Sequence, residues 1–346
     1  MEKPIDRILV IKLRAIGDVV LATAVLPNLR RVFPRAEIHF MTEKPSLGVV
    51  RDNPFVDRIL SVPPDPFAKP FRLSSWKTFA RFIKGFRNAH YDLVLDLFGN
   101  PRSAWLTWFS GAPVRAGFDF RGRKFAYNKR ITPRGNRVHE VEFNLDAVRA
   151  MGIPVVQRKP FFPFTKKDEA VIDRWIEKNG LRGQFRIALH SWGSWQAKRW
   201  GLEHFAGLAD RLVRKYQARV ILLWGPGEKG QSQRIQQMSG EKTTLAPRMT
   251  LKQLGALLSK CRLVVANDSG PMHIAAAVGT PTVGIFGPTS WKLQGPYGKH
   301  SMAVYKKDVA CLGCNRLTCE ELTCMTTLEI DEVMKAVEKV MGGRKR

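Results

Sequence analysis

The sequence predicts an α/β protein made of two doubly wound domains in tandem, each built on a parallel sheet. The chain has 346 residues, which is enough for two domains of ordinary size. Short apolar runs alternate with segments of helical period along its whole length. Around residues 153–164 the passage IPVVQRKPFFPF has three prolines and no helical period, which indicates a crossing between domains. We therefore expect one domain over residues 1–160 and a second over residues 161–346.

The first half predicts strands at its apolar β-rich runs and helices between them. Strands are expected near residues 7–13, 36–41, 58–62, 91–97 and 114–117. Helices are expected near residues 19–31, 45–51, 74–88 and 101–110.

The second half repeats the alternation from residue 185 onward. Strands are expected at residues 185–190, 218–224, 262–268 and 281–287, and helices at residues 202–216, 250–261, 270–279 and 327–341. Because ligands bind at the carboxyl ends of parallel strands, two such domains are expected to place their sites toward a shared cleft.

The composition is strongly basic, with 57 Lys and Arg against 30 Asp and Glu, a formal net charge of +27. Such an excess attracts polyanions, whether nucleic acid, anionic lipid or phosphorylated glycan. No apolar stretch is long enough to span a bilayer, and the start MEKPIDR lacks the apolar region of a signal peptide. We expect a cytoplasmic protein, with the inner face of a membrane as a further location.

The passage VVANDSGPMHIAAAVG carries a pattern typical of phosphate binding. A buried strand runs into Asp268, Ser269 and Gly270, where a helix with an early proline begins. Exposed N–H groups and a hydroxyl at a helix start suit a phosphate, and His273 adds a donor. The alternative is that Asp268 caps the helix and His273 is an ordinary surface histidine. Spacing alone leaves both interpretations open.

Two further loops follow strands in the same half. HSWGSWQAKRW presents Ser194 and Lys198, whose ammonium suits a diphosphate, and LLWGPGEKGQS presents Glu228, which suits ribose hydroxyls. The alternatives are a solvated lysine and a helix-start acid. The sequence has no G-x-G-x-x-G opening a βαβ unit and no Walker A motif, which weakens dehydrogenase and kinase interpretations.

Near the start, the apolar run broken at RAIG is followed by one carboxylate, Asp18. It is either an acid at a helix N-terminus or a catalytic base at the lip of a cleft.

Four passages, read together in their order, resemble family 9 of the glycosyltransferases, the ADP-heptose:lipopolysaccharide heptosyltransferases. They are ILVIKLRAIGDVVLATAVLPNLRRVFP, AKRWGLEHFAGLADRL, LLWGPGEKGQ and VVANDSGPMHIAAAVGTPTVGIFGPTS. The resemblance covers essentially the whole chain. It implies a GT-B fold of two Rossmann-like domains, with the acceptor on the first and the ADP-sugar on the second.

The resemblance also implies roles for residues at matching positions. Asp18 is the general base of an inverting transfer of heptose to the inner core of lipopolysaccharide, and Lys198 binds the diphosphate. Glu228 binds ribose, and the Asp268-Ser269-Gly270 turn, followed by His273, cradles phosphate. The chemistry requires no metal cofactor. Many relatives have proline where this chain has Gly201 and Trp291, which leaves the donor sugar open.

Residues 115–137 hold eight Lys or Arg and one acid. In an acceptor domain, Arg121, Arg123 and Lys124 are expected to bind phosphate and carboxylate groups of the acceptor; a merely solvated loop is the alternative. The helix near residues 74–88 has an apolar stripe, for which core packing is favoured, and a basic face that suits anionic headgroups.

Four of the five cysteines form the passage CLGCNRLTCEELTC: Cys311, Cys314, Cys319 and Cys324. Four thiolates suit a structural zinc ion or an iron–sulfur cluster, although the spacing is not that of a zinc ribbon. Metal binding and plain reduced thiols both remain open.

Two other functions are weighed against heptosyl transfer. A nucleic-acid-binding protein with a structural metal site explains the charge but not the two phosphate-type loops, so no nucleic-acid partner is expected. An enzyme that acts on another nucleotide sugar would also explain the two phosphate-type loops. An epimerase of this kind would need a nicotinamide site, which the sequence lacks.

Overall fold

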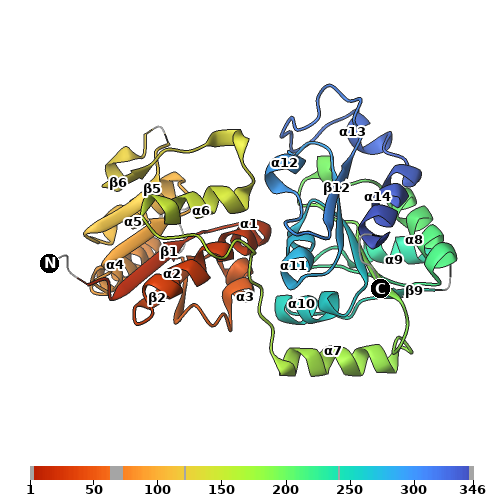
Figure 1. Cartoon of the computed structure of the whole chain (residues 1–346), viewed down its shortest axis with the longest axis horizontal. Coiled ribbons are helices and arrows are strands. Elements are labelled where there is room, and N and C mark those ends of the chain that lie inside the picture. Colours follow the sequence, from red (N-terminus) through yellow and green to blue (C-terminus); the bar gives the residue numbers. More distant parts are fainter. Residues whose placement is uncertain (1–3, 63–72, 121, 241, 343–346) are drawn as a thin grey trace. The chain divides into compact units, whose positions relative to one another are not determined.

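The computed structural model describes residues 4–62, 73–120, 122–240 and 242–342. Its contacts divide the chain into two compact units, Met1–Phe161 and Phe162–Arg346, each with its own sheet (Figure 1). Among the residues described, no helix combines the length and the apolar character that crossing a lipid bilayer requires.

The first unit has a six-stranded sheet in the order β3-β2-β1-β4-β5-β6, in which every pair is parallel. Its strands are β1 (Arg7–Ile11), β2 (Glu37–Thr42), β3 (Arg58–Ser61), β4 (Leu93–Asp96), β5 (Val114–Phe118) and β6 (Lys129–Ile131). Its α-helices are α1 (Ile16–Ala22), α2 (Leu26–Val32), α3 (Leu47–Val50), α4 (Leu73–Arg87), α5 (Pro101–Phe109) and α6 (Glu140–Ala150). Short 3₁₀ turns are η1 (Thr23–Val25), η2 (Lys44–Ser46), η4 (Lys124–Ala126) and η5 (Gly135–Arg137).

The second unit repeats this topology with the order β12-β11-β10-β7-β8-β9, again all parallel. Its strands are β7 (Arg186–His190), β8 (Arg219–Leu222), β9 (Thr243–Leu245), β10 (Leu263–Asn267), β11 (Thr282–Phe286) and β12 (Ser301–Tyr305). Its helices are α7 (Lys166–Lys178), α8 (Leu202–Tyr216), α9 (Lys229–Met238), α10 (Leu251–Ser259), α11 (Gly270–Val278), α12 (Trp291–Gln294), α13 (Thr323–Thr326) and α14 (Ile330–Gly342), with the 3₁₀ turn η6 (Gln196–Lys198).

In both sheets, later strands are added first on one side of the first strand and then on its other side. The switch points lie between β1 and β4 in the first unit and between β7 and β10 in the second. At such a point the loops at the carboxyl ends diverge to opposite faces, which opens room for a ligand. The two switch points are therefore where a site is expected in each unit.

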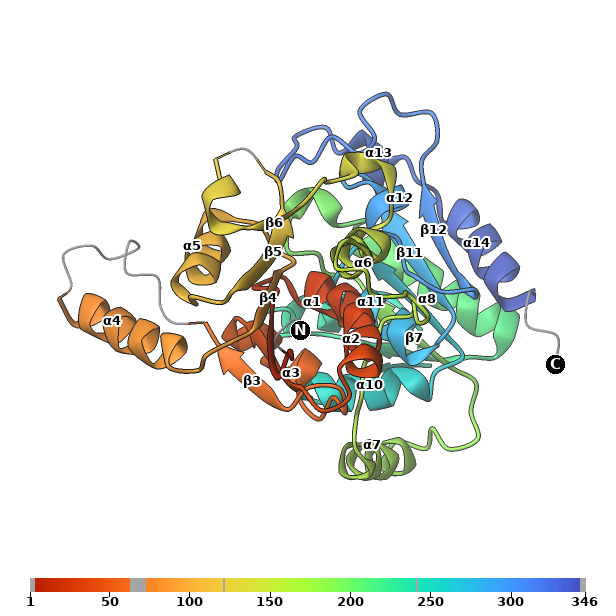
Figure 2. The ribbon, with the colours of Figure 1, turned by 60° about the vertical axis from the view of Figure 1, so that its left-hand side comes forward.

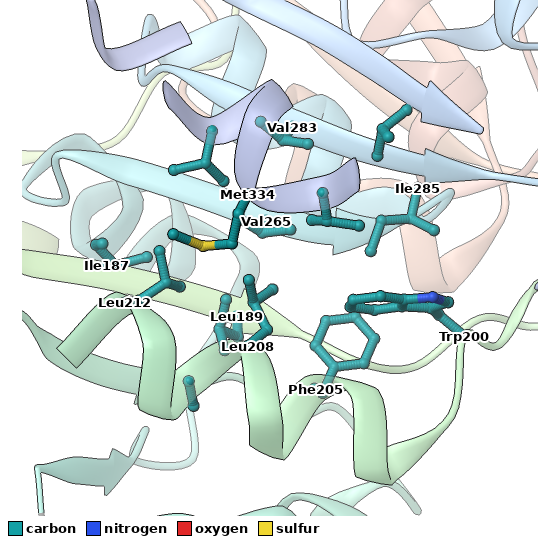
Figure 3. Packing of buried hydrophobic residues seen from close by; sticks show 14 of the residues in the cluster. Ile187, Leu189, Trp200, Phe205, Leu208, Leu212, Val265, Val283, Ile285 and Met334 are labelled. Carbon is teal, nitrogen blue, oxygen red and sulfur yellow. The ribbon is translucent and has the colours of Figure 1, made fainter. Parts of the chain in front are cut away.

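The core of the second unit forms where alternate residues of the central strands meet two helices (Figure 3). Leu189 of β7 and Val265 of β10 pack with Phe205 of α8 and Met334 of α14. Trp200 is 1% exposed, and its Nε1 donates a hydrogen bond to the Leu328 carbonyl at 2.8 Å. This buried indole anchors the end of the loop that follows β7.

The structure corrects one predicted element and adds others. The single helix expected near residues 19–31 is two helices, α1 and α2, joined by the 3₁₀ turn η1. Pro27 lies in the first turn of α2, and because proline has no N–H it cannot continue the hydrogen bonds of α1. Residues 153–164 contain no helix or strand, as expected.

Three strands, β6, β9 and β12, were not predicted from the sequence. Each is an edge strand of its sheet. They are short or half-exposed, so they lack the continuous apolar run of a buried strand. The helices that it does not announce include α7 and α9, in which only two residues each are buried.

Candidate functional site

His190 joins the carboxyl ends of three strands of the second unit. It is the last residue of β7, and its side chain is 4% exposed. Its Nδ1 lies 3.1 Å from the Ser269 hydroxyl, and its Nε2 lies 3.2 Å from Glu228 Oε2. Ser269 follows β10 and Glu228 follows β8. His190 is not among the residues predicted from the sequence, where its one signal is its position at the end of the strand FRIALH and the start of a polar loop.

Asp268 is the most enclosed acid of this group, at 5% exposed. Its Oδ2 lies 2.6 Å from Lys198 Nζ and accepts a hydrogen bond from the Thr289 hydroxyl at 2.7 Å. The predicted His273 is also buried, with Nε2 3.9 Å from Asp268 Oδ1, so it is not a surface histidine. The structure therefore brings Lys198, Asp268 and His273 together and adds Thr289.

Helix α11 begins at Gly270, and its N-cap is Ser269 rather than Asp268. The Ser269 side chain makes no capping hydrogen bond to α11; its hydroxyl instead donates to the Asn267 carbonyl at 2.9 Å. The first N–H groups of a helix attract anions because they lack partners within the helix. The start of α11 thus has the character of an anion site, beside the ammonium of Lys198.

The loop that carries Lys198 is held in place by aromatic rings. Lys198 Nζ lies 4.2 Å from the centre of the Trp195 ring, and the Arg199 guanidinium lies 3.5 Å from the centre of the Trp192 ring. Burial lowers the pKa of Arg199 from its ordinary value, although the charge of Glu228 raises it. Such cation–π contacts orient both cations. The predicted Ser194 lies in the same loop and is exposed.

Glu228 occupies the helix-start position that the sequence left as one of two alternatives. It is the N-cap of α9, as a helix-start acid would be, and its Oε2 accepts the Gly225 N–H at 2.6 Å. The same oxygen faces His190, and the side chain is 16% exposed. The carboxylate is therefore fixed at the end of β8 and still reaches solvent.

The cysteine-rich segment makes backbone hydrogen bonds to two of these loops. The Gly313 N–H donates to the Gly287 carbonyl at 2.9 Å, and the Asn315 N–H donates to the Pro288 carbonyl at 2.7 Å. The Ala197 N–H, next to Lys198, donates to the Leu317 carbonyl at 3.3 Å. The segment thus supports both the loop of Lys198 and the loop of Thr289, which the sequence did not indicate.

Of the two alternatives left open for this segment, a structural metal site is not supported. Cys311 and Cys314 are exposed, Cys319 is half-buried and Cys324 is buried, and all are free thiols. Within the described part of the chain, no three His, Cys, Asp or Glu side chains gather as metal ligands would. Cys261, two residues after the last residue of α10, is buried.

In the first unit, Asp18 stands in the first turn of α1, directly after the loop that follows β1. Its Oδ2 accepts a hydrogen bond from the Ala15 N–H at 2.9 Å, so the helix-start role is real. This contact does not exclude a second role for the carboxylate, so it does not decide between the two interpretations of Asp18.

Lys12, which the sequence analysis missed, lies at the switch point of this sheet and is 4% exposed. Its ammonium donates to the Leu97 carbonyl at 3.0 Å and to Glu140 Oε1 at 2.7 Å. Burial alone lowers the pKa of Lys12, but the charges of Glu140, Asp18 and Asp96 outweigh it and raise the pKa above 10.5. A lysine directly after a buried strand was the available signal.

Of the three residues expected to bind an acceptor, Arg121 lies outside the described residues. Arg123 donates to the Gly99 carbonyl at 2.8 Å, and its guanidinium lies 5.7 Å from the centre of the Phe120 ring. Lys124 is 57% exposed and lies 3.6 Å from Asp119. These two cations are held by local contacts, and Lys124 is the more accessible.

The two departures from the family pattern have local explanations. Gly201 has φ +98° and ψ 150°, a conformation that proline, with φ fixed near −65°, cannot adopt. Trp291 stacks on Tyr305 with ring centres 4.7 Å apart. Gly201 and Trp291 therefore fix the backbone and the ring packing at the starts of α8 and α12.

Comparisons with known proteins identify one family over most of the chain. The model of Glycosyltransferase family 9 (heptosyltransferase) matches residues 79–324. Lipopolysaccharide heptosyltransferase 1 of Pseudomonas aeruginosa is 26% identical over 90% of this chain and 87% of its own length.

Solved structures of similar proteins have the same fold. The glycosyl transferase family 9 protein from Veillonella parvula DSM 2008 covers 99% of both chains with a TM-score of 0.85 and 24% identity. Escherichia coli heptosyltransferase WaaC with ADP covers 96% of this chain and 99% of its own, with a TM-score of 0.76 and 21% identity. The predicted α/β architecture of GT-B type is confirmed.

Proposed function

Because the chain belongs to glycosyltransferase family 9 and is therefore a glycosyltransferase, we propose that it transfers heptose from ADP-heptose to the inner core of lipopolysaccharide. The proposal rests chiefly on one observation: Lys198, Asp268 and the start of α11 lie together at the switch point of the second sheet. A cation beside a helix N-terminus suits the diphosphate of a nucleotide sugar.

The donor is proposed to bind to the second unit. Its diphosphate lies against Lys198 and the N–H groups that follow Ser269, where Gly270 allows close approach. Its ribose hydroxyls bind Glu228 at the end of β8. His190 contacts both Ser269 and Glu228, so it keeps the phosphate and ribose positions in a fixed relation.

Asp18 is proposed as the general base of a single displacement. It takes the proton of an acceptor hydroxyl while that oxygen attacks the anomeric carbon, and the bond from that carbon to the ADP oxygen breaks with inversion. Negative charge then develops on the departing ADP. Lys198 and the start of α11 offset that charge, so the proposal includes no metal cofactor.

The acceptor is proposed to bind to the first unit, as an anionic lipid-linked glycan. Lys124 and Arg123 supply cations there, and arginine forks suit phosphate and carboxylate groups. Because such an acceptor is anchored in a membrane, the proposal includes contact with the anionic surface of the cytoplasmic leaflet. A transferase that uses another nucleotide sugar is the alternative, and Gly201 and Trp291 are where its donor loops would differ.

Calorimetric titration of the purified protein with ADP, UDP, GDP and NAD tests the proposal. Selective binding of ADP, weakened by Glu228→Ala but not by the matched surface change Glu177→Ala, is the expected result. It is followed by transfer from ADP-heptose to a core oligosaccharide. Preference for UDP or GDP would keep the reaction class and change the donor. Absence of binding to all four nucleotides would overturn the proposal.

A further inference from the structure

Three large aromatic side chains stand together on the surface of the first unit. Trp105 and Trp108 of α5 are 44% and 46% exposed, and Phe125 of η4 is 46% exposed. The ring centres of Trp105 and Phe125 lie 4.8 Å apart, and those of Trp105 and Trp108 lie 5.8 Å apart. Together with the half-buried Phe109 they form one group, called here the aromatic patch.

The aromatic patch is not needed to attach α5 to the sheet. Helix α5 buries the opposite side of its surface, with Ala104 and Leu106 among the buried residues. Large exposed aromatic groups cost solubility, and when they cluster they mark an interaction site. The patch is therefore a surface with an unassigned partner.

The surroundings of the patch are strongly positive. Residues 73–135 contain twelve Lys or Arg, three Asp and no Glu. Of the three acids, Asp92 and Asp96 are buried, and Asp119 lies beside Lys124. Among the described residues of this region, the exposed cations are Arg81, Lys84, Arg87, Lys124, Lys129, Arg130 and Arg134, of which Arg134 is paired with Asp146.

These cations and the patch belong to neighbouring elements. Helices α4 and α5 contact each other, and both contribute to one apolar cluster on the same side of the sheet (Figure 2). The Arg87 Nε lies 3.9 Å from the point where a Cβ on Gly111 would stand, just beyond the end of α5. Lys124 directly precedes Phe125. Positive side chains therefore lie on the elements next to those that carry the aromatic patch.

We propose that the aromatic patch, with the exposed cations of α4, η4 and β6, docks the first unit onto the surface of an anionic lipid bilayer. Indole rings favour the interface between headgroups and acyl chains, and each Lys or Arg near an anionic surface strengthens the electrostatic attraction. The inference deepens the proposed function, since an enzyme that modifies a lipid-anchored glycan gains from residing at that surface.

The same observations refine the expectation from the sequence and argue against a nucleic acid. In the apolar stripe expected on α4, Phe86 is buried, as core packing predicts, while the side chains of Trp76 and Phe79 lie outside the described part of the chain. The exposed aromatic side chains lie on α5 and η4 instead. Trp105 is stacked on Phe109. Rings that cover one another offer little open face for the bases of a single strand, whereas they insert together into a lipid interface.

Vesicle flotation of the full chain tests the proposal, with phosphatidylglycerol-containing and pure phosphatidylcholine vesicles as probes. We expect binding to the anionic vesicles only. Trp105→Ser with Trp108→Ser should weaken it at least about tenfold, because two interfacial indoles are lost. Met238→Ser, which changes a side chain of the same 46% exposure on the second unit, is the matched control and should bind as the unchanged protein does.

A charge variant separates electrostatic from apolar attraction. Lys84→Glu with Arg87→Glu should weaken binding by roughly tenfold or more, whereas the equal charge change Lys166→Glu with Lys167→Glu, at exposed positions of α7, should matter less. Hydrogen exchange of the unchanged protein on vesicles gives a measurement that needs no variant, with protection expected over residues 101–109 and 124–126.

Equal binding by all variants, or no protection of these residues, would overturn the docking surface. Tight binding to single-stranded or duplex DNA at physiological salt, with no binding to vesicles, would overturn it in favour of a nucleic-acid partner. Because flotation is measured without nucleotide, its outcome is independent of the ADP titration: failure of the titration removes the proposed function, and failure of flotation removes the docking surface alone.

Discussion

The ammonium of Lys198 lies 2.6 Å from Asp268 Oδ2, with the two side chains 12% and 6% exposed. Each charge is therefore largely removed from water and compensated by the other. A phosphate that binds Lys198 must share this cation with Asp268, so the two residues act as one unit in both stability and binding.

Lys198→Ala is expected to weaken ADP binding by about 1.5–3 kcal/mol, the worth of a charged hydrogen bond. It should also destabilise the fold by about 3–5 kcal/mol, because Asp268 is left as a buried uncompensated charge. The double variant Lys198→Ala/Asp268→Asn should regain much of the stability but not the affinity. Calorimetry and urea unfolding measure the two effects separately.

The control for this prediction is Lys260→Ala, which breaks a pair with Asp173 whose side chains are 24% and 57% exposed. An exposed pair contributes about 0–1 kcal/mol, so stability should change little and ADP affinity not at all. Unchanged ADP affinity in Lys198→Ala would place the diphosphate elsewhere.

Asp18→Asn is expected to lower turnover by about 10²–10⁴-fold, the usual contribution of a general base. Asparagine keeps an oxygen that can accept the Ala15 N–H, so the start of α1 should remain folded. ADP affinity should stay the same because the nucleotide is proposed to bind to the other unit. The measurement is transfer to a confirmed acceptor beside an ADP titration, and near-normal transfer would leave Asp18 as a helix-start acid only.

Lys12→Met is expected to destabilise the first unit by about 3–5 kcal/mol, since Glu140 loses its buried cation. Lys306→Met removes a more exposed pair with Glu332, at 26% and 34% exposure, and should cost much less. Thermal unfolding compares them. Equal losses of unfolding free energy in the two variants would show that burial of Lys12 does not increase the contribution of its ion pair to stability.

The same pair predicts a pH dependence. The pKa of Lys12 is raised in the fold above its ordinary value of 10.5. A raised lysine pKa adds stability that is fully present below pH 10.5 and is lost as the pH rises through the folded value. The difference in unfolding free energy between the unchanged protein and Lys12→Met should therefore be constant near neutral pH and shrink only in strong alkali.

The cysteines are expected to differ sharply in reactivity. Burial, and then the nearby thiols of Cys311, Cys314 and Cys319, raise the pKa of Cys324 to about 11. At neutral pH this buried thiol is protonated and should be alkylated by iodoacetamide far more slowly than the exposed Cys311 and Cys314. Mass spectrometry of the labelled peptides measures the rates.

The same labelling decides between plain thiols and a metal. If the cysteines are plain thiols, a chelator should leave the alkylation rate of each cysteine unchanged. Protection of all four cysteines that a chelator abolishes would show a bound metal and contradict the free-thiol state of the structure.

Much of the fold was predictable because its signals are local. Each central strand is a short buried run, and Gly201 and Pro27 shape the chain within a turn of their own positions. The edge strands β6, β9 and β12 escaped prediction because a half-exposed strand has no apolar run to announce it.

The candidate site was predictable only as separate loops. Lys198, Glu228 and Asp268 each follow a predicted strand, and their side chains suit a diphosphate and ribose hydroxyls, but spacing alone left a structural alternative open for each of them. His190, Thr289 and Lys12 became visible only through their partners in space.

The sequence by itself determined that this chain is a tandem of parallel α/β units with phosphate-type loops after its strands, because hydrophobic period and turn residues act over a few neighbouring positions. The tertiary structure decided which loops meet. His190 contacts Ser269 across 79 residues, and Lys12 contacts the Leu97 carbonyl across 85 residues. Such pairs depend on the order of strands in the sheet, which places the ends of β7 and β10, and of β1 and β4, side by side.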